Sequence, residues 1–450
     1  MANSSENQLK RTIKTFDLIG NKSGSKVSIL DGIISVAYYE SIQQNSVAVT
    51  VTYVDSGTVT DGTEKKSVLE GLPLTGSEKA GIKITDNYGV TLGDKPKLDL
   101  FVNTVSPVVD STTTGVVSLT LVSKEYIMNE KGCTRVVERM NEKISDNIQK
   151  LFEDNLKTKK TLDIEETENN YNFIPNNKKP MYIINWLSKK SVPKGKGGKS
   201  AGFFFWETSK GYHFKSIDSL MDKKKNPKKK SIIYNETVQK RGESIPAGYE
   251  AKAIEYQKNN KINVKDKMKM GFQSTRIITF DPFSGLYEVK NTEANTSELD
   301  TAGKELAPIN KELQCGGNND NYTRTTYYIK DTGTLNTGDT TEDQVAASEK
   351  ENFLFNEIEN QAIRRYNQLY SAETIVTIGG DFSLHAGDQL RVDFSEYNKK
   401  DDVDKKDGGS YIISDLVHYI SSSGTYTKMN LVRDSFGRKG GATSTVASGR

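Results

Sequence analysis

The sequence predicts a mainly β protein with a mixed α/β domain in its middle. Short runs of β-branched residues, separated by turn residues, fill the first and last parts of the chain. Between them, apolar residues recur at three- and four-residue steps, which is typical of an amphipathic helix. The chain has 450 residues, and at roughly 150 residues per domain this length allows about three domains.

The composition describes a folded but polar protein. Apolar residues, counted with Gly and without Tyr, make up about 37% of the chain, below the roughly 45–50% of an average globular domain. The 21 Tyr and 16 Phe residues argue against disorder, because chains that cannot fold are poor in aromatic residues. Much of the chain is therefore expected at a surface or in loops.

The charges nearly balance, with 62 basic and 59 acidic residues. The resulting net charge of +3 does not favour nucleic-acid binding and excludes a histone-like protein. Cys133 and Cys315 are far apart in sequence and predict neither a disulfide framework nor a zinc site. A polar N-terminus, and no stretch near the roughly 20 apolar residues that span a bilayer, predict a soluble protein without membrane insertion.

Residues 1–123 predict a first β domain, built as a barrel or sandwich of half-buried strands. The odd positions from Val47 to Tyr53 are apolar or aromatic, and most of the residues between them are polar or small. The same alternation returns in Val117, Leu119 and Leu121. Other strand-like runs are Ile82–Thr85 and Leu98–Val102.

Residues 124–222 predict a mixed α/β domain. Apolar residues between Arg135 and Leu156 share one face at helical spacing, which predicts one helix of about six turns. These residues are Val137, Met140, Ile144, Ile148, Leu151 and Phe152. Three segments at 161–166, 180–187 and 202–207 follow and complete the predicted domain.

Residues 223–436 predict a second β domain. It opens with the lysine-rich run Lys223–Lys230, which is expected to be a linker or loop. Strand signals return at Thr275–Thr279 and Gly285–Val289, and closing strands are expected between Thr374 and Arg433.

A long polar insertion interrupts this second β domain. The segment Asn291–Glu349 is rich in Asn, Thr, Gly and Asp and is expected to be a mobile loop or an extended excursion. A helix is expected from about Thr341 to Tyr370, where apolar residues recur in helical step. Residues 437–450 are rich in Gly, Ser and Lys and predict a flexible C-terminal tail.

The closing strands of the two β regions are alike. Ser118–Glu125, at the end of the first region, resembles Lys428–Ser435, at the end of the second. Two amphipathic strands often look alike through alternation alone. Chance likeness and internal duplication both stay open.

No constellation of residues predicts a catalytic, cofactor or metal site. His213, His385 and His418 have no second ligand at metal spacing and are expected to be exposed or hydrogen-bonded strand residues. Asp415 lies near His418, but no Gly-x-Ser-x-Gly motif supplies a nucleophile. The chain is therefore predicted not to be an enzyme.

Three further motifs also have structural interpretations. Gly195–Ser200 is similar to a phosphate-binding loop, but Pro193 stands where the motif needs Gly, and Pro has no N–H to offer. The acidic pairs Glu165–Glu166 and Asp401–Asp402 are sequence neighbours, which point to opposite faces of a strand and cannot flank a glycosidic bond. Lys223–Lys230 has no interleaved aromatic residues for base stacking, which favours a solvated linker.

The order of several segments carries a family resemblance. In chain order they are Tyr39–Ser56, Leu72–Glu78, the pieces between Lys143 and Leu220, Leu384–Val392 and Gly409–Ser435. This order resembles the baseplate hub proteins of contractile-tailed bacteriophages. It covers most of the chain except Asn291–Glu349.

The resemblance implies two tube-like antiparallel β-barrel domains and an inserted α/β domain. It implies a homotrimer in which three chains form a pseudo-sixfold ring. That ring would adapt the six-fold tail tube to a three-fold central spike and line a channel through which DNA passes without specific binding. Further implied partners are baseplate wedge and tape-measure proteins. The implied location is the tail baseplate of the virion, after synthesis in the host cytoplasm, and no cofactor is implied.

Three alternatives stay open at this point. The hub of a phage-derived injection machine would have the same pattern. A carbohydrate-binding or polysaccharide-degrading β protein would need a row of exposed aromatic residues, for which only Trp186 and Trp206 are available as tryptophans. A nucleic-acid-binding module would use Lys223–Lys230 and bind DNA with steep salt dependence.

Overall fold

A computed structural model describes most of the chain between residues 12 and 434. It leaves out 23, 56, 58, 62–63, 73, 95, 111–114, 196–199, 235–244, 246, 259–263, 272–273, 283, 294–310, 314–321, 331–339, 344–354, 397–398 and 404–407. The glycine- and lysine-rich part of the Gly195–Ser200 loop, Cys315, most of Asn291–Glu349 and the tail 437–450 therefore lie outside the described residues.

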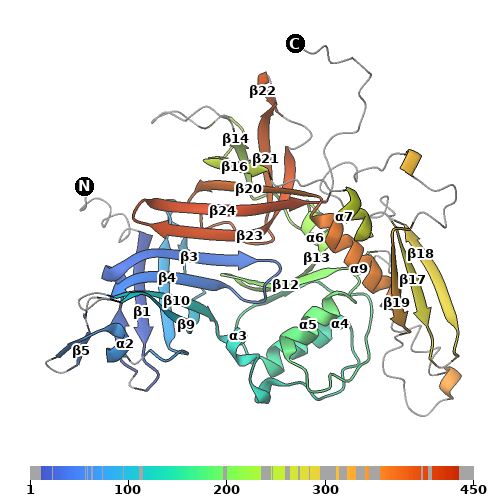
Figure 1. Cartoon of the computed structure of the whole chain (residues 1–450), viewed down its shortest axis with the longest axis horizontal. Coiled ribbons are helices and arrows are strands. Elements are labelled where there is room, and N and C mark those ends of the chain that lie inside the picture. Colours follow the sequence, from blue (N-terminus) through green and yellow to red (C-terminus); the bar gives the residue numbers. More distant parts are fainter. Residues whose placement is uncertain are drawn as a thin grey trace.

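The fold is mainly β, as predicted, and is dominated by one sheet of 16 strands (Figure 1). Its main path runs β15-β14-β21-β23-β3-β4-β10-β9-β7-β1-β2. The strands are β1 (Ile13–Ile19), β2 (Lys26–Ser28), β3 (Ile33–Ser41), β4 (Ala48–Asp55), β7 (Lys79–Thr85), β8 (Thr91–Leu92), β9 (Leu98–Asp110), β10 (Gly115–Ser123), β14 (Lys230–Tyr234), β15 (Ala251–Lys252), β16 (Glu255–Lys258), β20 (Ala372–Gly379), β21 (Gln389–Glu396), β22 (Lys399–Val403), β23 (Gly409–Ser421) and β24 (Gly424–Arg433).

Two four-strand units with the same topology lie within this sheet. The first has the order β4-β10-β9-β7 and the second β20-β24-β23-β21, with antiparallel neighbours throughout. Both have an extra residue at the same place. In the first unit, Asn103 of β9 is the extra residue of a β-bulge between the partners of Thr120 and Leu121. In the second unit, Ser414 of β23 is the extra residue between the partners of Asn430 and Leu431. Because β10 and β24 also occupy the same position, the likeness of their sequences is explained by internal duplication.

Strand β3 joins the two units into one sheet. It pairs with β4 on one side and with β23 on the other, from Ser41 opposite Asp415 to Ser35 opposite Ser421. Phe382 and Ile420 from the second region also pack into the core of the first. Among the described residues, the strands therefore form one open sheet and not the two closed barrels expected. Strand β3 continues the sheet from β4, the edge of the first unit, to the part of β23 that lies beyond its pairing with β21.

A mixed α/β layer packs beside the main sheet (Figure 1). Its small sheet has the order β11-β13-β12. Its elements are α3 (Lys124–Met128), α4 (Ile144–Lys150), a π-helical turn (Leu151–Asn155), β11 (Leu162–Ile164), α5 (Pro180–Ser188), β12 (Phe203–Thr208), β13 (Gly211–Ser216) and α6 (Ile217–Met221).

The six-turn helix predicted from Arg135 to Leu156 is wrong in its first half. The helix begins at Ile144, and the residues before it are extended, with bridges from Val136 to Lys178 and from Met140 to Phe173. Val136 and Met140 are buried, whereas Val137 is 66% exposed. The predicted stripe ran through Val137, Met140 and Ile144. The step of four from Met140 to Ile144 fits a helix and also an extended chain, whereas the step of three from Val137 fits only a helix, and Val137 is exposed.

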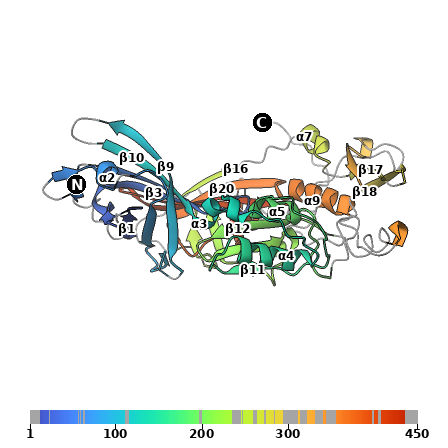
Figure 2. The same cartoon turned by 90° about the horizontal axis from the view of Figure 1, so that it is seen from below.

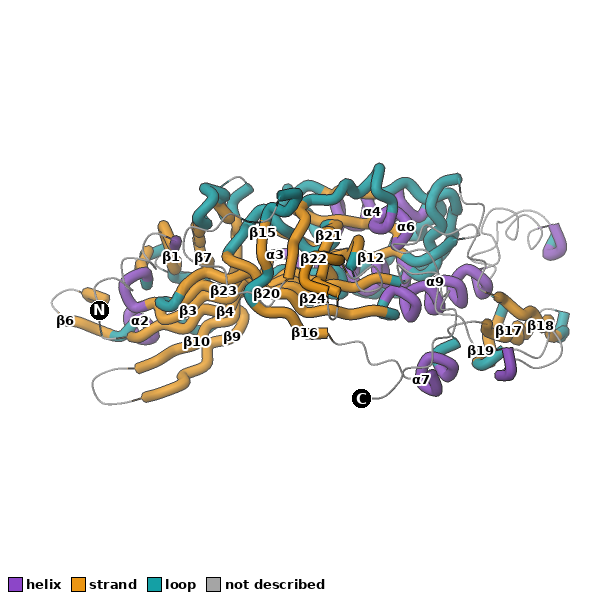
Figure 3. Tube along the Cα trace, turned by 90° about the horizontal axis from the view of Figure 1, so that it is seen from above, coloured by secondary structure: helices purple, strands orange, loops and turns teal. Residues whose placement is uncertain are grey.

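A second small sheet lies at the far end of the molecule from the first unit (Figures 1, 2 and 3). It has the order β18-β17-β19, from β17 (Ser274–Phe280), β18 (Tyr287–Glu293) and β19 (Arg324–Ile329). The insertion Asn291–Glu349 thus supplies one whole strand and the end of another, where only a loop or excursion was expected. Strand pairing with β17 stabilises these polar segments.

Helix α9 (Phe355–Leu369) packs against β17 and leads into β20. Residues 341–343 are also helical, and 344–354 are outside the described part of the chain. The remaining named elements are short. They are a helical turn at Leu30–Gly32, β5 (Val59–Asp61), β6 (Glu64–Lys66), α2 (Val68–Gly71), a turn at Gly132–Thr134, α7 (Val264–Lys269) and a turn at Lys311–Leu313.

Candidate functional site

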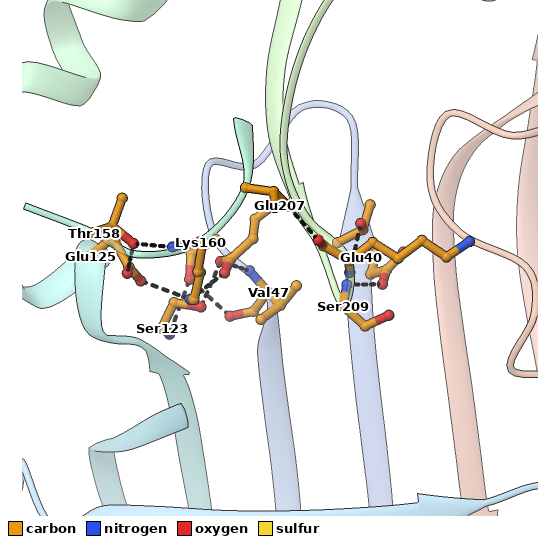
Figure 4. Close-up of polar contacts among 12 residues, drawn as sticks. Glu40, Val47, Ser123, Glu125, Thr158, Lys160, Glu207 and Ser209 are labelled. Carbon is orange, nitrogen blue, oxygen red and sulfur yellow. Dashed lines mark hydrogen bonds and ion pairs between the residues drawn. The ribbon is translucent and has the colours of Figure 1, made fainter. Parts of the chain in front are cut away.

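The β12–β13 hairpin carries the contact between the α/β layer and the main sheet. Glu207, near the end of β12, is 2% exposed. Its carboxylate accepts hydrogen bonds from the Val47 N–H at 3.0 Å and from the Ser123 hydroxyl at 2.5 Å (Figure 4). The hairpin is therefore anchored to the residues that precede β4 and end β10.

Lys160 lies between two buried carboxylates at this contact (Figure 4). Its Nζ is 2.6 Å from Glu207 and 2.7 Å from Glu125. Burial lowers the pKa of Lys160, but the charges of the two carboxylates outweigh it and raise the pKa overall. Burial in turn raises the pKa of Glu207. The lysine stays charged and holds together two groups that would otherwise repel.

Glu40 of β3 is a second buried carboxylate beside the same hairpin. It accepts hydrogen bonds from the Ser209 N–H at 2.9 Å, the Ala386 N–H at 3.0 Å and the Tyr38 hydroxyl at 2.8 Å. His385 Nδ1 is 3.2 Å away. Burial raises the pKa of Glu40, but the charge of His385 and these hydrogen bonds together lower it to about 2. One carboxylate thus connects β3, the hairpin turn and the loop before β21.

Arg365 of α9 makes a third buried cluster. Its guanidinium contacts Asp218 of α6 at 3.0 Å and Asp434, just after β24, at 2.6 Å. Burial lowers the pKa of Arg365, but the charges of Asp434 and Asp218 outweigh this effect, so the pKa lies above its usual value. The cluster joins the α/β layer, the long helix and the end of the second four-strand unit.

These three clusters lie where segments distant in sequence meet. Lys160 and Arg365 each face two carboxylates, and Glu40 and Glu207 accept hydrogen bonds from the protein. A buried carboxylate occupied in this way orders its neighbours and is poorly suited to proton transfer. The arrangement is therefore one of structural connection.

The overall fold is similar to that of a solved structure. The 43 kDa tail protein of prophage MuSo2 from Shewanella oneidensis superimposes with a TM-score of 0.51. The match covers 94% of this chain and 98% of that chain at 11% sequence identity. The chain has the fold of a phage tail protein.

Two other tail proteins are similar at lower scores. A tail protein from Neisseria meningitidis matches with a TM-score of 0.49 and 10% identity, over 93% of this chain and 96% of that chain. Prophage tail protein gp18 from Listeria monocytogenes matches with a TM-score of 0.45 and 8% identity, over 93% and 94%. No protein-family model matches the chain, and no curated protein sequence matches it.

The three histidines lie in different surroundings. His385 lies in a loop and not in a strand, and pairs with Glu40. His418 is buried in β23 with Nδ1 2.9 Å from the Thr427 hydroxyl, and burial lowers its pKa to about 4. His213 of β13 has Nε2 3.0 Å from the Thr208 hydroxyl. Each of them has a hydrogen-bond partner of its own.

One acidic pair and two residues of the lysine run also have partners. Glu165 accepts from the Ser216 N–H at 2.8 Å, whereas Glu166 contacts Lys143 and Lys194. In the lysine run, Lys225 contacts Glu165 and Lys230 contacts Asp381. Asp401 and Asp402 lie in β22, but their side chains are outside the description. Cys133 is exposed.

The tryptophans are not arranged as a carbohydrate platform. Trp206 is 2% exposed, and its indole N–H donates to the Ala386 carbonyl at 3.0 Å. Trp186 is half-buried against Tyr171 and Phe173. In the part of the chain that is described, no group of three or more His, Cys, Asp or Glu side chains is placed to hold a metal ion.

A search of the described helices found none with the length and apolar character needed to cross a bilayer.

The residues at these connections were not singled out from the sequence. Glu40 and Glu207 did carry a signal, because each stands next to strand residues that are otherwise apolar or aromatic. A carboxylate in such a run is either exposed or paired in the interior. Partners of such a carboxylate can lie far away in the sequence. Ser123 is 84 residues from Glu207 and Lys160 is 47 residues from it, and local patterns do not identify them.

Proposed function

We propose that the chain is a structural subunit of a phage tail baseplate, the hub that connects the tail tube to the central spike. The observation that carries this proposal is the duplicated four-strand unit, with the same strand order and the same extra residue in both copies. Three chains would contribute six such units to one ring. A ring of this kind has the six-fold pattern of a tube on one side and three-fold symmetry on the other.

The buried clusters support a structural role. Glu207, Glu40 and Arg365 each tie together elements from different parts of the chain. A subunit that transmits force during tail contraction needs such connections, because separate domains move relative to one another by default. We infer domains at 1–123, 124–222 and 223–436, held as one body, and no enzymatic activity.

The charge balance supports a channel that DNA passes through. Every lysine or arginine that pairs with a phosphate adds to retention of the nucleic acid. A chain with 62 basic and 59 acidic residues has little excess to retain DNA. The proposed partners are the tail tube and spike proteins, with wedge and tape-measure proteins around them, in the baseplate of the virion.

The test is assembly with the neighbouring tail proteins. The chain, of 50.0 kDa, is purified alone and together with the tube and spike proteins encoded beside it, and its mass is measured by light scattering after size exclusion. We expect a trimer, alone or with the spike, that appears in electron micrographs as a ring with a central opening. A chain that stays monomeric with both partners present contradicts the proposal.

A further inference from the structure

The three-stranded sheet β18-β17-β19 has one face that is apolar and open. Strand registers place Ile278 opposite Val289 and Tyr327, and Phe280 opposite Tyr287 and Ile329. Directly paired residues share a face, so these six side chains form one patch, which we call the open face. Tyr287 is 70% exposed, Val289 50%, Tyr327 73% and Ile329 68%, with Ile278 and Phe280 half-buried between them.

The other face of this sheet is covered by α9. Ile277, which points to that face, is 1% exposed. Thr275 accepts a hydrogen bond from Asn360 of α9, and Lys290 pairs with Glu357 of α9. A sheet with one face in the core normally has polar residues on its solvated face. Here the solvated face carries the larger apolar and aromatic side chains, which indicates that it is covered in the assembled state.

The chemistry of the open face fits a protein partner. None of its six side chains is charged, and Arg276, at its end, is directed to Tyr322, with its guanidinium 5.0 Å from the ring centre. Nucleic acid would need cations at this place. Central parts of protein interfaces are instead depleted in charge and rich in Tyr and Phe. Tyr287 and Tyr327 alone expose roughly 200–350 Å², a sizeable part of the about 800 Å² that each partner buries in a standard interface.

The position of the sheet favours a second copy of the chain as this partner. The molecule is elongated, with the first four-strand unit at one end of its long axis and the sheet β18-β17-β19 at the other (Figures 1 and 3). Contacts between the opposite ends of identical subunits close into rings when the rotation allows it. A face at one end of the molecule can therefore contact the next copy in a ring.

We propose that the open face is an interface between copies of this chain. The inference rests on the trimer of the proposed function and adds the surface that holds it. The neighbouring copy covers Tyr287, Tyr327 and Ile329, and this burial contributes a large share of the association free energy because aromatic side chains dominate such contacts.

The test is a pair of double variants. Y327E/I329E places two carboxylates in the open face. V137E/Y182E is the matched control, since it also replaces one exposed tyrosine and one exposed aliphatic residue, 56% and 66% exposed, in the α/β layer. Light scattering over a hundredfold range of concentration should show the wild type and the control as trimers, and Y327E/I329E as a monomer. Circular dichroism and melting temperature check the fold, and Y327S/I329S carries the same expectation if the charged variant does not fold.

Other outcomes overturn the inference. If Y327E/I329E stays trimeric but melts at a lower temperature, other residues of the same chain cover the face. If it stays trimeric and loses binding of the tube or spike protein, that protein covers it. Loss of the trimer in both double variants, or a wild type that is monomeric at every concentration, also contradicts it. A wild-type trimer that depends on the open face but binds neither tube nor spike protein overturns the proposed function alone.

Discussion

Lys160 shows how a single residue determines whether the α/β layer stays on the sheet. Its ammonium group lies between Glu125 and Glu207, whose side chains are 4% and 2% exposed. Two carboxylates buried this deeply repel each other strongly, and without the lysine they have to take up protons or water. The attraction to Lys160 is therefore required for the hairpin to keep its place.

Replacing Lys160 by Met tests this pairing. K160M keeps most of the side-chain volume and leaves two buried carboxylates uncompensated, so we expect the free energy of unfolding to fall by about 3–5 kcal/mol. The control is K79M, because Lys79 pairs with Asp99 at 2.8 Å but both side chains are largely exposed. Its loss should stay within about 1 kcal/mol. Urea denaturation measures both, and equal losses would contradict the argument.

Glu40 predicts a pH dependence of stability. Its pKa is about 2 in the folded protein and about 4.3 in an unfolded chain. A carboxyl group whose pKa is lowered by folding stabilises the protein above the unfolded value, and this contribution is lost as the pH falls from about 4.3 to 2. The shift corresponds to about 3 kcal/mol. E40Q should be less stable than the wild type at pH 7 by about this amount.

The difference between the two proteins should shrink as the medium is acidified below pH 4.3. Urea midpoints from pH 7 to pH 2.5 measure it. A difference that stays constant over the whole range would show that the Glu40 carboxylate does not contribute through its charge.

At the level of elements, the turn of the β12–β13 hairpin depends on one glycine. Gly211 has a φ of +132°, and a Cβ there would lie 2.5 Å from the Thr161 carbonyl oxygen. The same carbonyl accepts a hydrogen bond from the Tyr212 N–H at 2.8 Å. The turn therefore approaches the chain before β11 more closely than any side chain permits, and this approach brings the Ser209 N–H to Glu40.

The substitution G211A should displace this turn. We expect a loss of roughly 2 kcal/mol or more in the free energy of unfolding, since backbone strain and a steric clash act together. G81A in β7 is the control, because a Cβ at Gly81 meets nothing within 4 Å. It should leave stability unchanged or slightly raised. Urea denaturation with limited proteolysis of the hairpin distinguishes the two, and a stable G211A would contradict the close approach.

On the scale of the whole molecule, one continuous sheet connects the two four-strand units. β23 belongs to the second four-strand unit and also pairs with β3, beside the first. Glu40 and Arg365 then fix the α/β layer and α9 to both units. The small sheet β18-β17-β19 packs against α9 through β17, and its open face is exposed among the described residues.

The alternating strands could be predicted because alternation is a local property. Val47 to Tyr53 and Val117 to Leu121 alternate with a period of two. In the structure these residues lie in or next to β4 and β10, which are strands with one buried face. The likeness of β10 and β24 was visible too. The first half of the predicted helix failed: the four-residue step from Met140 to Ile144 fits a helix and also an extended chain, and Val137, counted as part of the buried face, is exposed.

By itself, the sequence determined the fold class, the polar character and the absence of any recognisable catalytic motif, because these depend on composition and on residues close together in the chain. Only the tertiary structure decided that β3 pairs with β23, that Lys160 faces Glu207 and that six apolar residues from three strands share the open face. Such contacts join residues that are distant in sequence. Their free energy arises from burial and charge pairing after the chain has folded, which no local pattern records.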